Sequence, residues 1–198
     1  MEDDFQPPKS FGLIAAIFEG GLAVLAVALG WLLGVDPLDT LRFSAADLGW
    51  GLLATGPPLG VLWICLKWPI GPLARLMQVV DELLIPLFRN CPTTEILVIC
   101  LLAGLGEEML FRGVVQQAVA DWVGGPAGVW SGLAASAALF ALVHRITNTY
   151  ALLAGLIGLY LGWIWLLSGN LLVPITAHTA YDFVVLVYLV RVRKPLAA

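Results

Sequence analysis

Two adjacent glutamates and an arginine lie in a stretch of sequence that is otherwise mostly apolar. Glu107, Glu108 and Arg112 fall within residues 94–120. An ionised group at mid-depth in a bilayer costs roughly 2.5–3.5 kcal/mol, so three in one span need a role. Residues four apart share a helix face, so Glu108 and Arg112 can pair, while Glu107 points about 100° away and stays unpaired. The pair would be a rigid support that aims Glu107. A clamp between helices is the other interpretation of this cluster.

The two histidines also lie inside or at the ends of apolar segments. Phe140 and His144 form a Phe-x-x-x-His pattern, and His178 and Asp182 form a His-x-x-x-Asp pattern. The carboxylate of the second pattern lies one helical turn along, where it can orient or charge-balance the imidazole. A single histidine on an apolar face is usually a packed core residue. Here, however, both histidines and the unpaired glutamate fall on three spans of one bundle.

These groups have the types needed for peptide hydrolysis in a membrane, which requires an activated water and a donor to the developing oxyanion. Glu107, unpaired and removed from water, suits a general base near neutral pH. His144 could share in activating the water. His178, held by Asp182, could stabilise the oxyanion or protonate the leaving amine.

The same side chains allow a metal-dependent alternative. Glu107, His144 and His178 make a set of two histidines and one glutamate that could hold zinc with an open water position. No compact His-Glu-x-x-His pattern is present to preform such a site. A mechanism without a metal cofactor is therefore the preferred hypothesis.

The composition places these motifs in a membrane protein. Of the 198 residues, 60% are hydrophobic and 12% are charged, about half the charged fraction of an ordinary soluble domain. The length suits one domain. The composition indicates that this domain is in contact with membrane lipid. No patch of Lys and Arg with interleaved aromatic residues is present, so nucleic acid is not expected as a partner.

The apolar segments predict an all-α, polytopic membrane helix bundle. Residues 68–90 repeat apolar side chains at helical spacing with charges on the other faces, which is typical of an amphipathic helix in the interface. We divide one integrated membrane domain into residues 1–92, with two spans and this helix, and residues 93–194, the catalytic bundle. The six spans are expected at residues 11–35, 48–66, 94–122, 127–144, 150–167 and 171–192.

Helix geometry predicts that two of the motif residues meet. Glu107 lies 15 residues before Trp122, and His144 lies 14 residues after Trp130. Taking the tryptophans as marks of the far interface, both side chains lie about 21–22 Å below it. Glu107 and His144 can therefore come together.

His178 follows Asn170 by only eight residues, so a straight helix would leave it nearer the far side. Pro174 suggests that residues 170–174 fold inward, which is tolerated where backbone lines a cavity. A further carboxylate, Glu19, has no partner three or four residues away. We expect it to hydrogen-bond to a neighbouring helix, with a role as a helper carboxylate as the alternative.

The basic residues are distributed unevenly between the two sides of the predicted bundle. Cytoplasmic loops carry an excess of Lys and Arg, so both termini are expected in the cytoplasm, with the chain in a bacterial inner (plasma) membrane. One side has only Arg42, and the other has Lys9, Lys67, Arg75, Arg89, Arg145, Arg191, Arg193 and Lys194.

The three motifs, in this order, resemble the CPBP family of intramembrane proteases. That family includes the type II CAAX prenyl endopeptidases and the bacterial Abi and bacteriocin-processing proteins. The resemblance covers residues 96–190 and implies a membrane peptidase acting on a peptide or a prenylated protein. The last motif position is commonly Asn in the eukaryotic enzymes and is Asp182 here, so this residue either contributes to an oxyanion site or only supports His178. The motifs are Glu107, Glu108 and Arg112, then Phe140 and His144, then His178 and Asp182.

The main hypothesis is therefore an intramembrane endopeptidase that hydrolyses a peptide bond of a membrane-associated or prenylated, CAAX-type substrate. A proton-coupled transporter could use the same acids and imidazoles as a relay, although the sequence has no pair of related halves with interrupted helices. A non-catalytic scaffold or immunity protein, with polar groups that only hold helices together, is the other alternative.

Overall fold

The computed structural model describes residues 10–193, and every regular element in that range is a helix. Five helical segments are long and apolar enough to cross a membrane. These segments confirm the predicted all-α bundle of an integral membrane protein. They are α1 (Phe11–Leu33), α2 (Ala45–Ala54) with α3 (Gly56–Lys67), α8 (Gly125–Val143), α9 (Asn148–Ser168), and α10 (Leu172–Val187) with the π-helix η3 (Tyr188–Val192).

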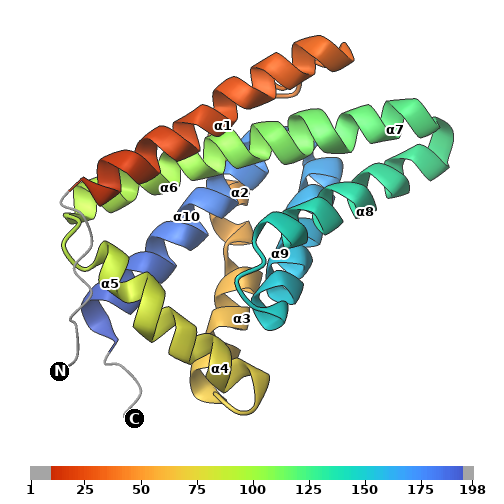
Figure 1. The fold of residues 1–198 in the computed structure, drawn as a ribbon. Coiled ribbons are helices and arrows are strands. Elements are labelled where there is room, and N and C mark those ends of the chain that lie inside the picture. The colour runs from red at the N-terminus through yellow and green to blue at the C-terminus, as the bar shows by residue number, and fades with distance from the viewer. Residues whose placement is uncertain (1–9, 194–198) are drawn as a thin grey trace.

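The remaining predicted span is a long helix that carries the charged motif. It runs without a break through α6 (Thr93–Glu108), the π-helix η2 (Met109–Gln116) and α7 (Gln117–Val123). Its length exceeds what a bilayer needs, and its charged residues distinguish it from the five apolar segments. In Figure 1, α1 lies alongside α6, and α8 returns beside α7.

The segment predicted as an interfacial helix is amphipathic, as expected. It consists of α4 (Pro72–Val79), the π-helix η1 (Val80–Leu84) and α5 (Ile85–Phe88). Apolar side chains such as Met77 and Ile85 are buried, whereas Arg75 and Glu82 are exposed. Its position at a membrane surface stays a prediction.

Several helices approach one another at glycines. A Cβ atom built on Gly51 of α2 would lie 2.8 Å from the carbonyl oxygen of Val173 and 2.5 Å from Cβ of Thr176. A Cβ atom on Gly106 of α6 would lie 2.5 Å from the carbonyl oxygen of Glu19 in α1. These glycines let α2 pack on α10 and α1 pack on α6 at backbone distance.

The largest apolar cluster surrounds η2 and lies directly beside the charged motif. It joins side chains from α1, η2, α8, α9 and the start of α10. This cluster holds the π-helix in place and excludes water from its inner face. Its buried members are Ala26, Met109, Leu110, Phe111, Val114, Phe140, Ala154, Trp165 and Leu171.

Residues 170–174 lie inside the protein, in agreement with the expected inward fold. Asn170 is 3% exposed, and its Nδ2 donates to the carbonyl oxygen of Arg42 at 2.8 Å and to Asp47 Oδ2 at 2.8 Å. The backbone N–H of Arg42 donates to Asn170 Oδ1 at 3.0 Å. Pro174 lies in the first turn of α10, where a missing N–H is tolerated. The depth of this segment in a bilayer and the orientation of the termini stay predictions.

The contact at Gly51 gives a test of this packing. Gly51→Ala should lower the free energy of unfolding by about 1–3 kcal/mol, because the methyl group meets backbone that cannot move aside. Gly49→Ala, on the same helix with nothing within 4 Å of its Cβ position, should be neutral or stabilising. Thermal unfolding of the two purified variants, followed by tryptophan fluorescence, measures the difference. Equal melting temperatures would contradict the packing of α2 on α10.

Candidate active site

Glu107 and Glu108 are the last two residues of α6, and the π-helix η2 begins at the next residue. Both carboxylates are buried, Glu107 with 7% and Glu108 with 0% of its surface exposed. A π-helix inside a longer α-helix is rare and is found often at functional sites. Here the π-helix changes the direction in which side chains leave the helix directly after the two acids. Side chains of η2 therefore contact α8 and α9.

The predicted ion pair is present and is completely buried. Arg112 Nη1 donates to Glu108 Oε1 at 2.7 Å, and both side chains are 0% exposed. Arg112 Nη2 donates to the carbonyl oxygen of Gly158 in α9 at 2.7 Å. The guanidinium also lies 5.0 Å above the ring of Phe140. The charges of Arg112 and Glu108 therefore compensate each other without water.

The inner face of η2 continues this row of polar contacts one turn further. Gln116 Nε2 donates to the carbonyl oxygen of Gly162 at 3.4 Å, one turn beyond Gly158 on α9. A Cβ atom on Gly162 would lie 2.5 Å from Gln116 Oε1. Ser136 of α8 donates to the carbonyl oxygen of Phe111 at 2.8 Å. These contacts fix η2 between α8 and α9.

Glu107 and His144 lie together, as their predicted depths required. His144 Nε2 is 3.6 Å from Glu107 Oε2. On the other side of the ring, Nδ1 is 2.8 Å from the carbonyl oxygen of Phe140. A carbonyl can only accept, so Nδ1 carries the hydrogen, and in a neutral ring Nε2 presents its lone pair to Glu107. Two acceptors facing each other suit a molecule that can donate to both, such as water.

His178 lies between two carboxylates. Its Nδ1 is 2.7 Å from Glu108 Oε1, and its Nε2 is 3.3 Å from Asp182 Oδ2. Ionised carboxylates only accept, so with both acids ionised both ring nitrogens carry hydrogen. Asp182 lies where the motif spacing placed it. The second contact, to Glu108, was not predicted.

Phe140 joins the two histidines. Its ring stacks on His144, with centroids 4.3 Å apart and planes inclined by 22°. It also meets His178 at 6.1 Å and Phe111 at 4.9 Å, both edge to face. One aromatic side chain therefore sets the orientation of both imidazoles.

The four motif side chains differ in their access to the surface. The side chains of His144 and Asp182 are 25% and 30% exposed, whereas those of Glu107 and His178 are 10% and 6% exposed. The site therefore opens past His144 and Asp182 and is closed behind Glu107.

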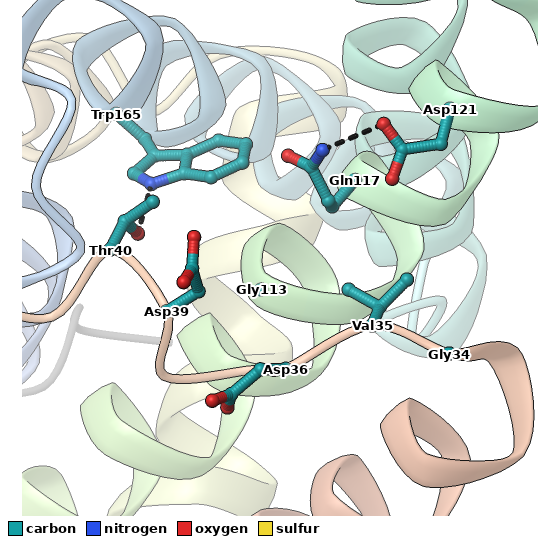
Figure 2. Close-up of a pocket in the computed structure, with 9 residues that line it drawn as sticks. All are labelled: Gly34, Val35, Asp36, Asp39, Thr40, Gly113, Gln117, Asp121 and Trp165. Atoms are coloured by element: carbon teal, nitrogen blue, oxygen red, sulfur yellow. Dashed lines mark hydrogen bonds between the residues drawn. The ribbon is translucent and has the colours of Figure 1, made fainter.

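A cavity of about 280 Å³ lies elsewhere in the described part of the protein. Figure 2 shows it between the loop after α1 and the end of the charged helix, with Trp165 hydrogen-bonded to Thr40 and Gln117 to Asp121. None of the motif side chains lines it, so the cavity does not mark the candidate site. Its lining residues are Gly34, Val35, Asp36, Asp39, Thr40, Gly113, Gln117, Asp121 and Trp165.

The zinc alternative can be tested against these donors. Among residues 10–193, no three His, Cys, Asp or Glu side chains are grouped in a way that could hold a metal ion. Both ring nitrogens of His178 face carboxylates, Glu108 and Asp182, so this ring has no nitrogen free for a shared metal. The set of Glu107, His144 and His178 therefore does not fit a zinc site in this arrangement.

The sequence analysis did not predict Tyr150 as a neighbour of the site, and it gave Glu19 a role there only as an alternative. Tyr150 lies with its ring 6.3 Å from that of His144, at the start of α9, where Thr147 caps the helix. Nothing in the local pattern around Tyr150 marks it, because its place depends on the turn between α8 and α9. Glu19 was noticed as a charge in an apolar span, but its direction could not be read from one helix.

Comparison with known proteins agrees with the motifs. Residues 89–184 match the family model described as "Type II CAAX prenyl endopeptidase Rce1-like". A relative from Bacillus subtilis (strain 168), "Uncharacterized protein YpbD", is 33% identical over 101 residues, which are 50% of this chain and 47% of the relative. The chain therefore spans about half the length of this relative. No solved structure matches the chain significantly.

The matched range contains every residue of the three motifs, from Glu107 to Asp182. It begins before α6 and ends within α10, so it takes in the helices that bring these side chains together. The family is one of peptidases. Residues 89–184, with their ordered motifs, are therefore similar to the Rce1-like family of type II CAAX prenyl endopeptidases.

Proposed function

We propose that the protein is an intramembrane endopeptidase that cleaves a membrane-associated or prenylated, CAAX-type substrate with a water activated by Glu107 and His144. The observation that carries this proposal is the pairing of Glu107 Oε2 with His144 Nε2 at 3.6 Å, both acceptors, next to His178. General bases act within hydrogen-bond reach of the proton that they remove.

In this proposal, a water molecule donates to Glu107 and His144, and Glu107 takes one of its protons. The hydroxide forms a bond to the carbonyl carbon of the substrate, and the carbonyl oxygen becomes an oxyanion. When the C–N bond breaks and the carbonyl forms again, the leaving nitrogen takes from Glu107 the proton that came from the water. The hydrogen bond of His144 to Phe140 keeps Nε2 turned towards this reaction.

His178 is the donor to the oxyanion in this scheme. Glu108 anchors Nδ1 at 2.7 Å, whereas the contact of Nε2 with Asp182 is longer, at 3.3 Å. A substrate oxygen that approaches Nε2 can therefore share this N–H with Asp182 or replace Asp182 as its acceptor, while the ring stays in place. Asp182 supports His178, because an ionised carboxylate has no hydrogen to donate. Fixed donors of this kind stabilise charge as it develops in the transition state.

The family resemblance and the surroundings of the site support the proposed substrate class. The helices that carry the site have apolar outer faces, which suits a substrate held in the membrane by a lipid group. The site opens past His144, which is followed by the basic residue Arg145. We therefore place the opening on the cytoplasmic side of a bacterial inner membrane, with both termini on that side.

The first test removes the base. Glu107→Gln or His144→Ala should lower kcat for a prenylated CAAX peptide by about 100- to 10,000-fold, because each removes a group that activates the water. Cleavage of a fluorogenic peptide by purified protein measures the loss. Glu82→Gln, an exposed acid on η1, is the control and should cleave normally. Normal cleavage by both active-site variants would contradict the proposal.

The second test asks whether the ion pair of Arg112 with Glu108 stabilises the fold around the site, as distinct from taking part in the reaction. Arg112→Met should lower the free energy of unfolding by about 3–5 kcal/mol, because the buried Glu108 would lose one of its two charged partners and keep only His178. Arg75→Met, at an exposed position of α4, should change it little. Thermal unfolding of the two variants, beside Glu107→Gln, measures this. Equal small losses for the two arginine variants would show that the ion pair does not hold the site.

The third test concerns metal. Cleavage should survive exhaustive treatment with a chelator, because the donors around His178 do not form a metal site. Metal analysis of the purified protein is the parallel measurement. Activity that is lost on chelation and restored by zinc, with stoichiometric zinc that disappears in His144→Ala, would contradict this expectation.

A further inference from the structure

Tyr150 of α9 lies against His144, the imidazole that faces the proposed water. The centroids of the two rings are 6.3 Å apart, and their planes are inclined by 63°. Phe140 stacks on the same imidazole at 4.3 Å from within α8. His144 therefore has one aromatic neighbour from its own helix and a second from α9, so Tyr150 forms part of the wall of the site.

The start of α9 fixes the backbone of Tyr150. Thr147 Oγ1 accepts from the backbone N–H of Tyr150 at 3.0 Å, and the carbonyl oxygen of Thr147 accepts from the N–H of Ala151 at 2.9 Å. In the turn before α9, the N–H of Ile146 donates to the carbonyl oxygen of His144 at 2.9 Å. A side-chain cap stabilises the first turn of a helix. The turn and the cap therefore set the position of Tyr150 relative to His144.

The hydroxyl of Tyr150 is available to a ligand. Among residues 10–193 it has no hydrogen-bond partner, and the surrounding side chains do not enclose it completely. Tyr160, further along α9, differs in this respect, because its hydroxyl donates to the carbonyl oxygen of Ala54 at 2.8 Å and so ties α9 to α2. Tyr160 therefore has a structural hydrogen bond, whereas Tyr150 keeps its donor free next to His144, at the opening of the site.

The side chains around the two imidazoles offer a peptide few hydrogen-bond donors. Ionised carboxylates only accept, Nε2 of a neutral His144 also accepts, and a phenylalanine ring does neither. A phenol hydroxyl can donate to a carbonyl oxygen and accept from an N–H, so it suits both polar groups of a peptide backbone. Tyr150 is therefore the neighbour that can hold a backbone carbonyl of a substrate. The described side chains that pair with or stack on the two rings are Glu107, Glu108, Phe140, Tyr150 and Asp182.

We propose that Tyr150 is a substrate-binding residue of the active site, whose hydroxyl donates to a backbone carbonyl of the bound peptide, one residue from the carbonyl that is attacked. This inference rests on the proposed function. The hydrogen bond would hold the peptide next to the water at Glu107 and His144, and it would leave no carbonyl without a partner in a site that excludes water. Because it forms when the substrate binds, its loss should raise KM more than it lowers kcat.

The test compares Tyr150→Phe with Tyr160→Phe in the whole chain in detergent, with a fluorogenic prenylated CAAX peptide as substrate. Tyr150→Phe keeps the ring beside His144 and removes only the hydroxyl, so KM should rise about 3- to 10-fold while the melting temperature stays that of the wild type. Tyr160→Phe should do the reverse, with a lower melting temperature and an unchanged KM. A Tyr150→Phe protein that melts earlier than the wild type would show a structural role and overturn the inference.

A change in the substrate locates the hydrogen bond. Two further peptides each carry a thiocarbonyl, a weaker acceptor, one residue before or one residue after the carbonyl that is attacked. The wild type should show a KM about 3- to 10-fold higher for one of them than for the unmodified peptide, whereas Tyr150→Phe should show nearly the same KM for all three. Equal discrimination by the wild type and by Tyr150→Phe would contradict a contact between this hydroxyl and the peptide backbone.

Binding to an inactive protein separates this inference from the proposed function. In a Glu107→Gln background, the fluorescence anisotropy of a labelled prenylated peptide measures Kd without cleavage. Adding Tyr150→Phe should weaken binding about 3- to 10-fold, and adding Tyr160→Phe should leave it unchanged. A Kd that Tyr150→Phe does not change would overturn the inference. Normal cleavage by Glu107→Gln would instead reject the proposed function, so the two failures are distinguishable.

Discussion

One carboxylate oxygen holds the candidate site together. Glu108 Oε1 accepts from Arg112 at 2.7 Å and from His178 at 2.7 Å, in a region where water does not reach. An ion pair this deep is costly to form unless each charge has further partners, and here both cations have them. The contact joins α10 to the charged helix, so the positions of His178, the proposed oxyanion donor, and of Glu107, the proposed base, depend on the same atom.

Small residues make this arrangement possible. Arg112 and Gln116 reach carbonyl oxygens of α9 at Gly158 and Gly162, where there is no side chain between the helices. A helix carbonyl can accept a second hydrogen bond, so α9 supplies polar partners without polar side chains. The outer face of the bundle stays apolar for this reason, while its inner face holds the ion pair of Arg112 with Glu108.

The sequence predicted those parts of the site that depend on spacing along one helix. Four-residue spacing indicated that Glu108 pairs with Arg112, and distances from tryptophans indicated that Glu107 meets His144. The contact of Glu108 with His178 could not be predicted, because it joins residues 70 apart and depends on how α10 packs on α6. The π-helix after Glu108 was missed for a similar reason: tertiary contacts, rather than local propensity, decide where one extra residue enters a helical turn.

The acid at position 182 changes the electrostatics of the site relative to the eukaryotic enzymes, in which this position is commonly Asn. An amide can donate to an oxyanion itself, whereas Asp182 can only accept. With Glu108 on the other side of the ring, an ionised Asp182 favours a cationic His178, which in the proposed mechanism is a stronger partner for an oxyanion than a neutral imidazole. The same carboxylate adds a negative charge to a site that already has Glu107, and a doubly protonated His178 next to Asp182 offsets that charge.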